Sequence, residues 1–265
     1  MPPESASLLR VEDVSMHFGG LTALSNVSLE VPPEHVTAVI GPNGAGKTTL
    51  FNCITGFYRP SSGRVMLRVD GQERPLHRLP VHRIAALGVG RTYQNIRLFS
   101  QMSVLENLLV AQHRFTRRGL LPGLLGTTAY RRAEAAALEQ ALFWLRVFGL
   151  EHAVSREAGT LPYGQQRALE VARAMAGRPR LLCLDEPAAG LNAQEARALN
   201  ALILRLKEEF RVSVLLIEHH MGVVMSISDQ VVVLDHGEVI SRGSPAQVQQ
   251  DPRVIHAYLG QEERS

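Results

Sequence analysis

Residues 35–49 read HVTAVIGPNGAGKTT. The first six are mostly apolar and rich in β-branched side chains, and Gly41 ends the run, so they predict a buried strand. The next nine place Gly41, Gly46, Lys47 and Thr48 at the spacing of a phosphate-binding loop. Helix-forming residues follow in KTTLFNCITG (47–56). A strand, a glycine-rich loop and a helix in this order predict a site for the phosphates of a nucleoside triphosphate.

The residue types of this loop match the chemistry that the site requires. Glycines let backbone N–H groups turn inward around a phosphate without a clash from Cβ. Lys47 is expected to reach the β and γ oxygens, and the Thr48 hydroxyl to ligate Mg²⁺. The alternative is an ordinary glycine-rich turn between a strand and a helix. The flanking strand and helix favour the phosphate site.

Composition excludes several other classes of protein. The chain has 265 residues with 28 Lys and Arg against 25 Asp and Glu, a net charge of +3 that is too small to indicate a nucleic-acid binder. Cys53 and Cys183 stand in apolar surroundings, which favours a reducing compartment over a disulfide framework. No secretory signal and no apolar run of about 18 residues is present. We therefore expect another subunit to bring the chain to any membrane at which it works.

Strand and helix patterns alternate along the chain and predict a largely parallel α/β sheet. Ser103 with Glu106, and Asn192 with Glu195, form capping boxes that predict helix starts. Helical periodicity covers residues 131–148, and the region of about 98–178 has no strand pattern, so it is expected to be a helical insert. Further strands and hairpins are predicted at RVMLRVDG (64–71), LLCL (181–184), VSVLLI (212–217) and VVVLDHGEVISRG (231–243).

Two adjacent acids follow a predicted buried strand in LLCLDEP (181–187). Ligands bind at the carboxyl ends of strands in open α/β sheets. Asp185 is suited to hold Mg²⁺, and Glu186 to polarise an attacking water as a general base. A polar exit from a strand is the plainer alternative, but next to a phosphate loop the catalytic interpretation is favoured. The pair predicts hydrolysis as well as binding.

Together these motifs resemble the ATP-binding subunit of an ATP-binding cassette (ABC) transporter. The resemblance covers nearly the whole chain, with the motifs in family order from about residue 10 to 243. It implies an α/β fold of the RecA-like P-loop NTPase type, in which a parallel-sheet core carries an antiparallel β subdomain and a helical signature subdomain. The implied division is residues 1–97 and 179–243 for the catalytic core, 98–178 for the helical subdomain and 244–265 for a C-terminal helical tail.

The resemblance also assigns site residues, and it makes ATP and Mg²⁺ the cofactors. Gln94 in RTYQNIRLF matches the glutamine loop, which in this family meets Mg²⁺ and the attacking water and faces the transmembrane partner. His219 in LLIEHH matches the switch histidine, so Glu186, His219 and Gln94 are the expected catalytic residues. A lone glutamine is usually a surface residue, and His220 competes with His219. Thr48, Gln94 and Asp185 are the expected metal ligands. ATP is expected to contact Phe18, which could also be a core residue, together with Gly41, Pro42, Asn43, Gly44, Ala45, Gly46, Lys47, Thr48 and Thr49.

The stretch LPYGQQR (161–167) matches the family signature, usually Leu-Ser-Gly-Gly-Gln. It predicts a helix start suited to an anion, yet no lysine stands beside it. In this family the signature completes the ATP site of a second subunit, which implies that Pro162, Tyr163, Gly164 and Gln165 act in trans. Pro162 replaces the usual serine, Asn192 the usual aspartate of the D-loop (188–192), and His220 the usual acid after the switch histidine.

Several segments look closest to the ATPase of bacterial branched-chain amino-acid importers. They include residues 91–113, the insert that extends to Tyr130, and the tail DPRVIHAYLG (251–260). This likeness implies a second ATPase subunit, identical or different, two membrane permeases, a periplasmic binding protein, and a place on the cytoplasmic face of the inner membrane. Uptake of urea or short amides, and export of lipopolysaccharide, are related alternatives. A soluble ABC ATPase of DNA repair or translation is less favoured, because the chain has one cassette and no long coiled coil.

Overall fold

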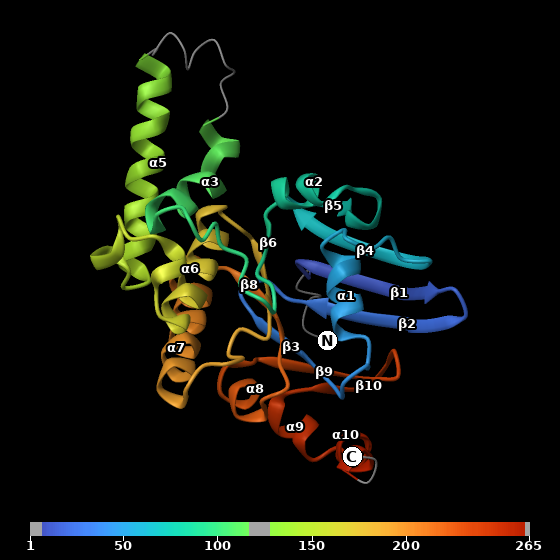
Figure 1. Ribbon diagram of the computed structural model, residues 1–265. Helices are drawn as coiled ribbons and strands as arrows, with labels where there is room; N and C mark the ends of the chain where they lie inside the picture. Colours follow the sequence, from blue (N-terminus) through green and yellow to red (C-terminus); the bar gives the residue numbers. More distant parts are fainter. Residues whose placement is uncertain (1–6, 117–127, 263–265) are drawn as a thin grey trace. The chain divides into compact units, whose positions relative to one another are not determined.

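The computed structural model describes residues 7–116 and 128–262. They form two compact units, Met1–Arg91 with Arg180–Ser265 and Thr92–Pro179, and each is described by itself (Figure 1). Part of the insert before Tyr130, residues 117–127, lies outside the described residues. None of the described helices has both the length and the apolar composition needed to cross a membrane.

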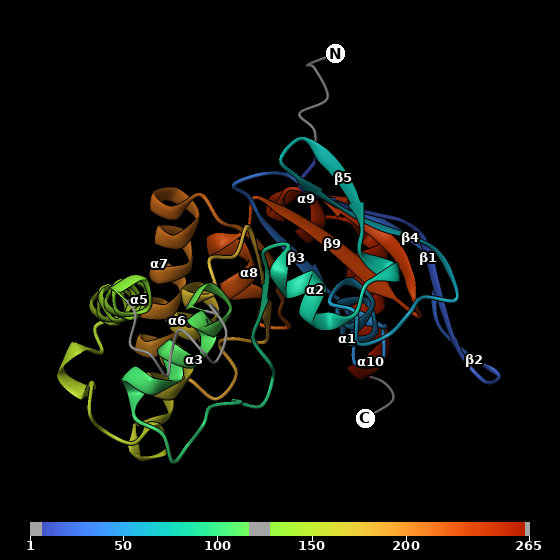
Figure 2. The ribbon, with the colours of Figure 1, turned by 90° about the horizontal axis from the view of Figure 1, so that it is seen from above.

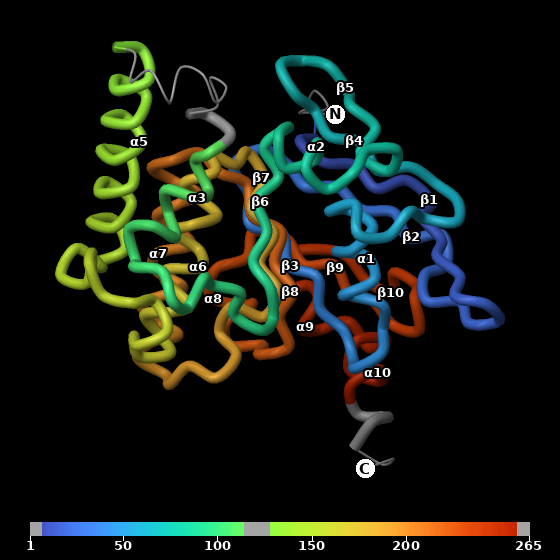
Figure 3. Tube along the Cα trace, turned by 45° about the horizontal axis from the view of Figure 1, so that its top comes forward, coloured from blue at the N-terminus to red at the C-terminus, as the bar shows by residue number. Residues whose placement is uncertain are grey.

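A six-stranded sheet forms the centre of the first unit, in the order β10-β9-β3-β8-β7-β6 (Figure 3). All neighbours are parallel except β9 and β10, which form a hairpin at one edge. Every residue of β3, β7 and β8 is buried, as expected of parallel strands covered on both faces. The strands are β3 (Val36–Ile40), β6 (Val89–Arg91), β7 (Leu181–Asp185), β8 (Ser213–Ile217), β9 (Gln230–Asp235) and β10 (Glu238–Gly243).

A second, antiparallel sheet of four strands has the order β2-β1-β4-β5. Its strands are β1 (Leu9–Phe18), β2 (Leu21–Val31), β4 (Ser62–Val69) and β5 (Gln72–Pro75). Asp70 and Gly71 make the predicted turn between β4 and β5, both with positive φ. Buried side chains of this sheet share one apolar core with Leu50, Phe51 and Ile54 of α1 and with strands of the parallel sheet. Figure 1 shows α1 next to β1, β2 and β4.

Most helices of the first unit connect its strands, and the last two, α9 and α10, follow the β9–β10 hairpin. Asn192 begins the longest of them, because its side chain accepts the N–H groups of Gln194 and Glu195 in the predicted capping box. The helix α7 then buries Leu199, Ile203 and Leu206. The helices are α1 (Lys47–Ile54), α2 (Val81–Ala86), α7 (Ala193–Phe210), α8 (Met221–Ile227), α9 (Pro245–Gln249) and α10 (Pro252–Glu262), with a short 3₁₀ turn, η1 (Leu76–Arg78).

The second unit is helical, as the sequence predicts. Its helices are α3 (Val104–Thr116), α5 (Thr128–Val147) and α6 (Tyr163–Ala176), with 3₁₀ turns η2 (Glu151–Ala153) and η3 (Ala158–Thr160). The three helices pack against one another (Figure 2). Glu106 accepts the N–H of Ser103 at 2.7 Å and donates its own N–H to the Ser103 hydroxyl at 3.2 Å, which confirms the capping box before α3. Among the described residues of this unit, β structure is limited to an isolated bridge between Ser103 and Glu157.

Candidate nucleotide site

The loop from Gly41 to Gly46 joins the end of β3 to the start of α1. Gly46 is the N-cap of α1 and has φ of 98°, while Gly41 and Gly44 have φ of 150° and 81°. A Cβ on Gly41 would lie 2.0 Å from the carbonyl oxygen of Leu234, and one on Gly46 would lie 2.6 Å from that of Ala23. Both positions therefore require glycine for space as well as for backbone conformation.

Hydrogen bonds tie the loop to its surroundings. The Ala45 N–H donates to the carbonyl of Pro42 at 3.2 Å, and the Gly237 N–H, from the turn between β9 and β10, donates to the carbonyl of Ala45 at 3.1 Å. Thr48 and Thr49 stand in the first turn of α1, where N–H groups have no partner within the helix. The loop is thus fixed against the sheet before any ligand contact is considered.

Lys47 lies over this loop and is 8% exposed. Its Nζ donates to the carbonyls of Gly41 at 2.7 Å and Pro42 at 2.8 Å. Burial lowers the pKa of Lys47, whereas the charges of Glu186 and Asp185 raise it. The lysine and the two acids therefore share one electrostatic environment at the carboxyl ends of β3 and β7.

Asp185 and Glu186 leave β7 with different surroundings. Asp185 is 4% exposed, and its Oδ2 lies 3.5 Å from Nη2 of Arg91. Glu186 has φ of 46°, a left-handed conformation that is uncommon for a residue other than glycine. Its N–H donates to the carbonyl of Ile217 at 3.0 Å, which anchors the turn to β8. The two adjacent carboxylates therefore have different partners, Arg91 for Asp185 and His219 for Glu186.

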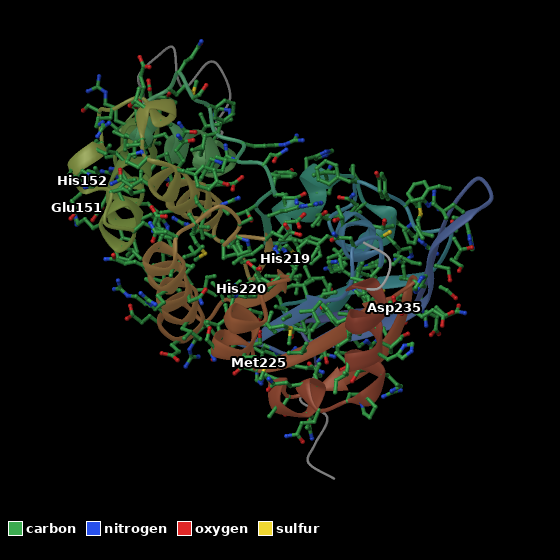
Figure 4. All side chains as sticks on the ribbon, turned by 60° about the horizontal axis from the view of Figure 1, so that its bottom comes forward. Glu151, His152, His219, His220, Met225 and Asp235 are labelled. Atoms are coloured by element: carbon green, nitrogen blue, oxygen red, sulfur yellow. The ribbon has the colours of Figure 1, made fainter. Side chains whose placement is uncertain are left out.

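His219 is the histidine that reaches the acidic pair. Its Nδ1 lies 3.5 Å from Oε1 of Glu186, and its side chain is 57% exposed. His220 is the N-cap residue of α8 and makes no side-chain cap hydrogen bond. Figure 4 shows both histidines in the segment that leads from β8 into α8. The position of His219 agrees with the proposed switch role, which stays a prediction.

Sequence reasoning missed Glu218, which ends the apolar run just before His219. It is 1% exposed, and its Oε1 accepts the N–H of Ala188 at 3.1 Å. Burial raises the pKa of Glu218, while hydrogen bonds from the N–H groups of Ala188 and His220 lower it. This carboxylate ties the loop after Glu186 to the end of β8. An acid that directly follows an apolar strand run was the available signal.

Arg91 is a second residue that the sequence did not single out. Its Nη1 donates to Oδ1 of Asn52 at 2.8 Å and to Oγ1 of Thr55 at 2.6 Å, and its guanidinium carbon lies 5.2 Å from the ring centroid of Phe57. Together with its approach to Asp185, these contacts link the C-terminal end of α1 to the end of β7. The three-residue strand β6 that carries Arg91 gave too short a pattern to reveal it.

Phe18 ends β1 and is 40% exposed, so it is not a core residue. Its ring packs edge to face against Tyr58, with centroids 5.2 Å apart and an interplanar angle of 75°. An exposed aromatic face of this kind is available for stacking. Its contact with adenine stays a prediction.

Gln94 and the signature residues belong to the second unit. Gln94 lies in the irregular segment that precedes α3. Pro162 is the N-cap of α6, with φ of −53° and no side-chain cap hydrogen bond, and Tyr163, Gly164 and Gln165 form the first turn. In the first unit, by contrast, the structure brings Lys47, Asp185, Glu186 and His219 together. It places the signature residues at a helix start, as the sequence predicts.

The donor set of the first unit suits a magnesium ion. Mg²⁺ prefers hard oxygen ligands, and it usually takes one or two from protein and others from phosphate and water. The Thr48 hydroxyl and the Asp185 carboxylate are donors of this type. No group of three His, Cys, Asp or Glu side chains within the described ranges could hold a metal alone.

The fold and this site define a class of protein, the ATP-binding cassette ATPases. A family model described as ABC transporter matches residues 24–189, and one described as branched-chain amino acid ATP-binding cassette transporter matches residues 238–264. The chain belongs to the ABC transporter family, as an ATP-binding subunit, and it is an ATPase that drives transport. The predicted P-loop NTPase fold class is confirmed.

Individual curated proteins and solved structures resemble the chain over nearly its whole length. The chain is 53% identical to the high-affinity branched-chain amino acid transport ATP-binding protein BraF of Pseudomonas aeruginosa, over 97% of this chain and 99% of that protein. It is 49% identical to LivG of Escherichia coli K12, which has the same description, over the same shares. Among solved structures, the ADP conformation of MJ1267, an ATP-binding cassette of an ABC transporter, matches with a TM-score of 0.82 and 32% identity, over 96% of this chain and 99% of that one.

Proposed function

We propose that the chain hydrolyses MgATP as one of two ATPase subunits of a bacterial importer for branched-chain amino acids. One observation supports this most directly. Lys47, the consecutive Asp185 and Glu186, and His219 come from three separate segments and gather at the carboxyl ends of the neighbouring strands β3, β7 and β8. This is the edge at which an α/β sheet binds its ligands.

Each residue has a role that its chemistry supports. Lys47 and the N–H groups of the phosphate loop bind the β and γ phosphates, and Phe18 stacks on adenine. Glu186 accepts a proton from the attacking water, and His219 orients the γ-phosphate. Thr48 and Asp185, joined by Gln94, would hold Mg²⁺, which when bound neutralises charge on the phosphate oxygens.

The rest of the assembly follows from the signature helix. Tyr163, Gly164 and Gln165 present N–H groups in the first turn of α6, and Pro162, which has no N–H, is the N-cap residue before them. No lysine stands beside these groups, which suits a γ-phosphate bound by another subunit. We propose a partner ATPase subunit, two permeases at the cytoplasmic face of the inner membrane, and a periplasmic binding protein. Residues 1–97 with 179–243, 98–178 and 244–265 would act as the catalytic core, helical subdomain and tail.

Uptake by intact cells tests this proposal. A strain that lacks the gene is complemented with wild type, with Lys47→Ala or with Lys207→Ala, and uptake of labelled leucine, isoleucine and valine is measured beside urea and a short amide. Lys47→Ala should abolish uptake of the three amino acids, because it removes a charged contact to the phosphates. Lys207 is the other lysine of the chain and pairs with Asp229 at 3.2 Å, so its variant serves as the control.

Two results would contradict the proposal, and the Lys207→Ala control separates a catalytic effect from a change in protein abundance. Undiminished leucine, isoleucine and valine uptake with Lys47→Ala would exclude this chain as the motor. Loss of urea or amide uptake alone would move the substrate assignment to that branch. Equal loss with Lys207→Ala would show that the effect is one of protein abundance.

A further inference from the structure

The signature helix contains a buried ion pair that the proposed chemistry does not use. Arg167 and Glu170 are 0% and 1% exposed, and Arg167 Nη1 lies 3.0 Å from Glu170 Oε2. Removing two charges from water carries a desolvation cost that their mutual attraction often fails to offset. The pair is therefore better explained by what else the two side chains bind.

Arg167 binds the backbone of the glutamine loop. Its Nη1 donates to the carbonyl of Tyr93 at 2.8 Å, and its Nη2 donates to the carbonyl of Gln94 at 2.8 Å. The same Nη2 donates to the hydroxyl of Tyr163, in the signature, at 3.1 Å. A single guanidinium thus connects the backbone of Gln94 to a signature side chain within the second unit.

Glu170 binds the same segment as a hydrogen-bond acceptor, whereas Arg167 binds it as a donor. Its Oε1 accepts the N–H of Arg97 at 3.1 Å and that of Tyr93 at 3.4 Å. Burial raises the pKa of Glu170, and these N–H groups together with Arg167 lower it. One side chain of the pair satisfies carbonyls of residues 93–97 and the other satisfies N–H groups, so the segment is held from both sides.

We propose that Arg167 and Glu170 are positioning residues that fix the Gln94 segment to the signature helix, so that a displacement of one is transmitted to the other. This inference rests on the proposed function, in which Gln94 faces the membrane subunits and Tyr163 and Gly164 meet the partner's nucleotide. The pair couples those two contacts without touching nucleotide itself.

The sharpest variant is Arg167→Lys. It keeps the positive charge next to Glu170, but an ammonium cannot reproduce the planar fork that reaches two carbonyls and a hydroxyl. The matched control is Arg173→Lys on the same helix. Arg173 is a half-buried arginine whose guanidinium carbon lies 5.7 Å from the ring centroid of Phe99, and lysine keeps the positive charge that acts on Glu170. Glu170→Gln is the second variant, because it keeps an acceptor oxygen for the N–H groups of Tyr93 and Arg97.

The test uses the assembled transporter in proteoliposomes, with and without leucine-loaded binding protein. Arg167→Lys should reduce the stimulation of ATPase activity by about tenfold, the size of one lost hydrogen bond to a charged group, with basal kcat and the KM for ATP changed by less than about twofold. Glu170→Gln should lose less, and Arg173→Lys should be stimulated like wild type. Hydrogen exchange at the Tyr93 and Arg97 amides should accelerate in Arg167→Lys but not in Arg173→Lys.

Each alternative outcome would contradict the coupling role, the positioning role or the proposed function. Normal stimulation of Arg167→Lys, or an equal loss of basal and stimulated activity, would exclude a coupling role for the pair. Unchanged exchange at Tyr93 and Arg97 would exclude the positioning role, whatever the transport assay gives. A wild-type transporter that leucine-loaded binding protein does not stimulate would contradict the proposed function instead, and the exchange result would still decide the positioning role.

Discussion

Glu186 adopts a left-handed backbone conformation, with φ of 46°, directly after the buried strand β7. For a residue with a Cβ this conformation costs roughly 1–2 kcal/mol. Two contacts hold it in place, the Glu186 N–H to the Ile217 carbonyl at 3.0 Å and the neighbouring Ala188 N–H to Glu218 at 3.1 Å. The strained turn places Oε1 of Glu186 3.5 Å from Nδ1 of His219. In the proposed function, this carboxylate is the general base for the attacking water.

Replacing Glu186 by Gln should separate binding from turnover. The amide has nearly the same shape but cannot accept the proton of water, and loss of a general base costs roughly 10²–10⁴-fold in rate. MgATP affinity should persist, and ATP should hold the subunits together as a dimer. Single-turnover ATPase assays and size-exclusion chromatography with ATP measure both. Glu208→Gln, at an exposed position of α7, is the control; an ordinary rate in Glu186→Gln would disprove the base assignment.

Gly41 and Gly44 offer a matched pair for the phosphate loop. Both have positive φ, but a Cβ on Gly41 would lie 2.0 Å from the Leu234 carbonyl oxygen, and one on Gly44 would meet nothing within 4 Å. Gly44→Ala should therefore cost only backbone strain, about 1–2 kcal/mol of unfolding free energy. Gly41→Ala should cost about 1–3 kcal/mol more, because the chain must also move away from β9. Chemical denaturation of both variants measures the difference, and equal losses would contradict the packing argument.

At the scale of elements, α7 depends on its first residue. The Asn192 side chain accepts from the N–H groups of Gln194 and Glu195, and Glu195 accepts the Asn192 N–H at 3.0 Å. Asn192→Ala removes this cap and should lower the unfolding free energy by about 1 kcal/mol, whereas Asn192→Asp should keep it, because both residues are good N-caps. Thermal unfolding checks this, with exposed Gln194→Ala as the control. An equal loss in Asn192→Asp would show that the cap is not the cause.

Elements with strong local patterns were predictable, and those stabilised by distant contacts were not. The residues of β3, β7 and β8 are mostly apolar and all buried. Ser103 and Asn192 mark helix starts because each pairs with an acid three residues later. By contrast, β6 has only three residues, Val89–Arg91, and exists because β7 pairs with it. In β1 and β2, Asp13 and Asn26 have positive φ, and their pairing shifts register near Asp13, which breaks the alternation that would identify strands.

The candidate nucleotide site also contains residues with a local sequence pattern and residues that depend on distant contacts. The phosphate loop, Asp185 and Glu186 are contiguous motifs whose chemistry can be recognised from spacing alone. Glu218, Arg91 and Arg167 act through partners 30, 94 and 73 positions away, namely Ala188, Asp185 and Gln94. Such contacts arise only when the topology brings those segments together. Sequence therefore identified the residues expected to meet nucleotide and missed those that hold them in position.

At the scale of the whole molecule, the chain has one phosphate loop and one signature, and the proposed function assigns them to different ATP sites. We therefore expect the rate of MgATP hydrolysis per chain to rise with protein concentration until the subunits are paired, by mass action. Steady-state ATPase assays over a range of protein concentrations, with the oligomeric state measured by light scattering at each point, provide the test. Lys47→Ala should stay inactive throughout, which controls for contaminating ATPases. If a preparation that remains monomeric hydrolyses ATP at full rate at every concentration, the site is complete within one chain and α6 has another role.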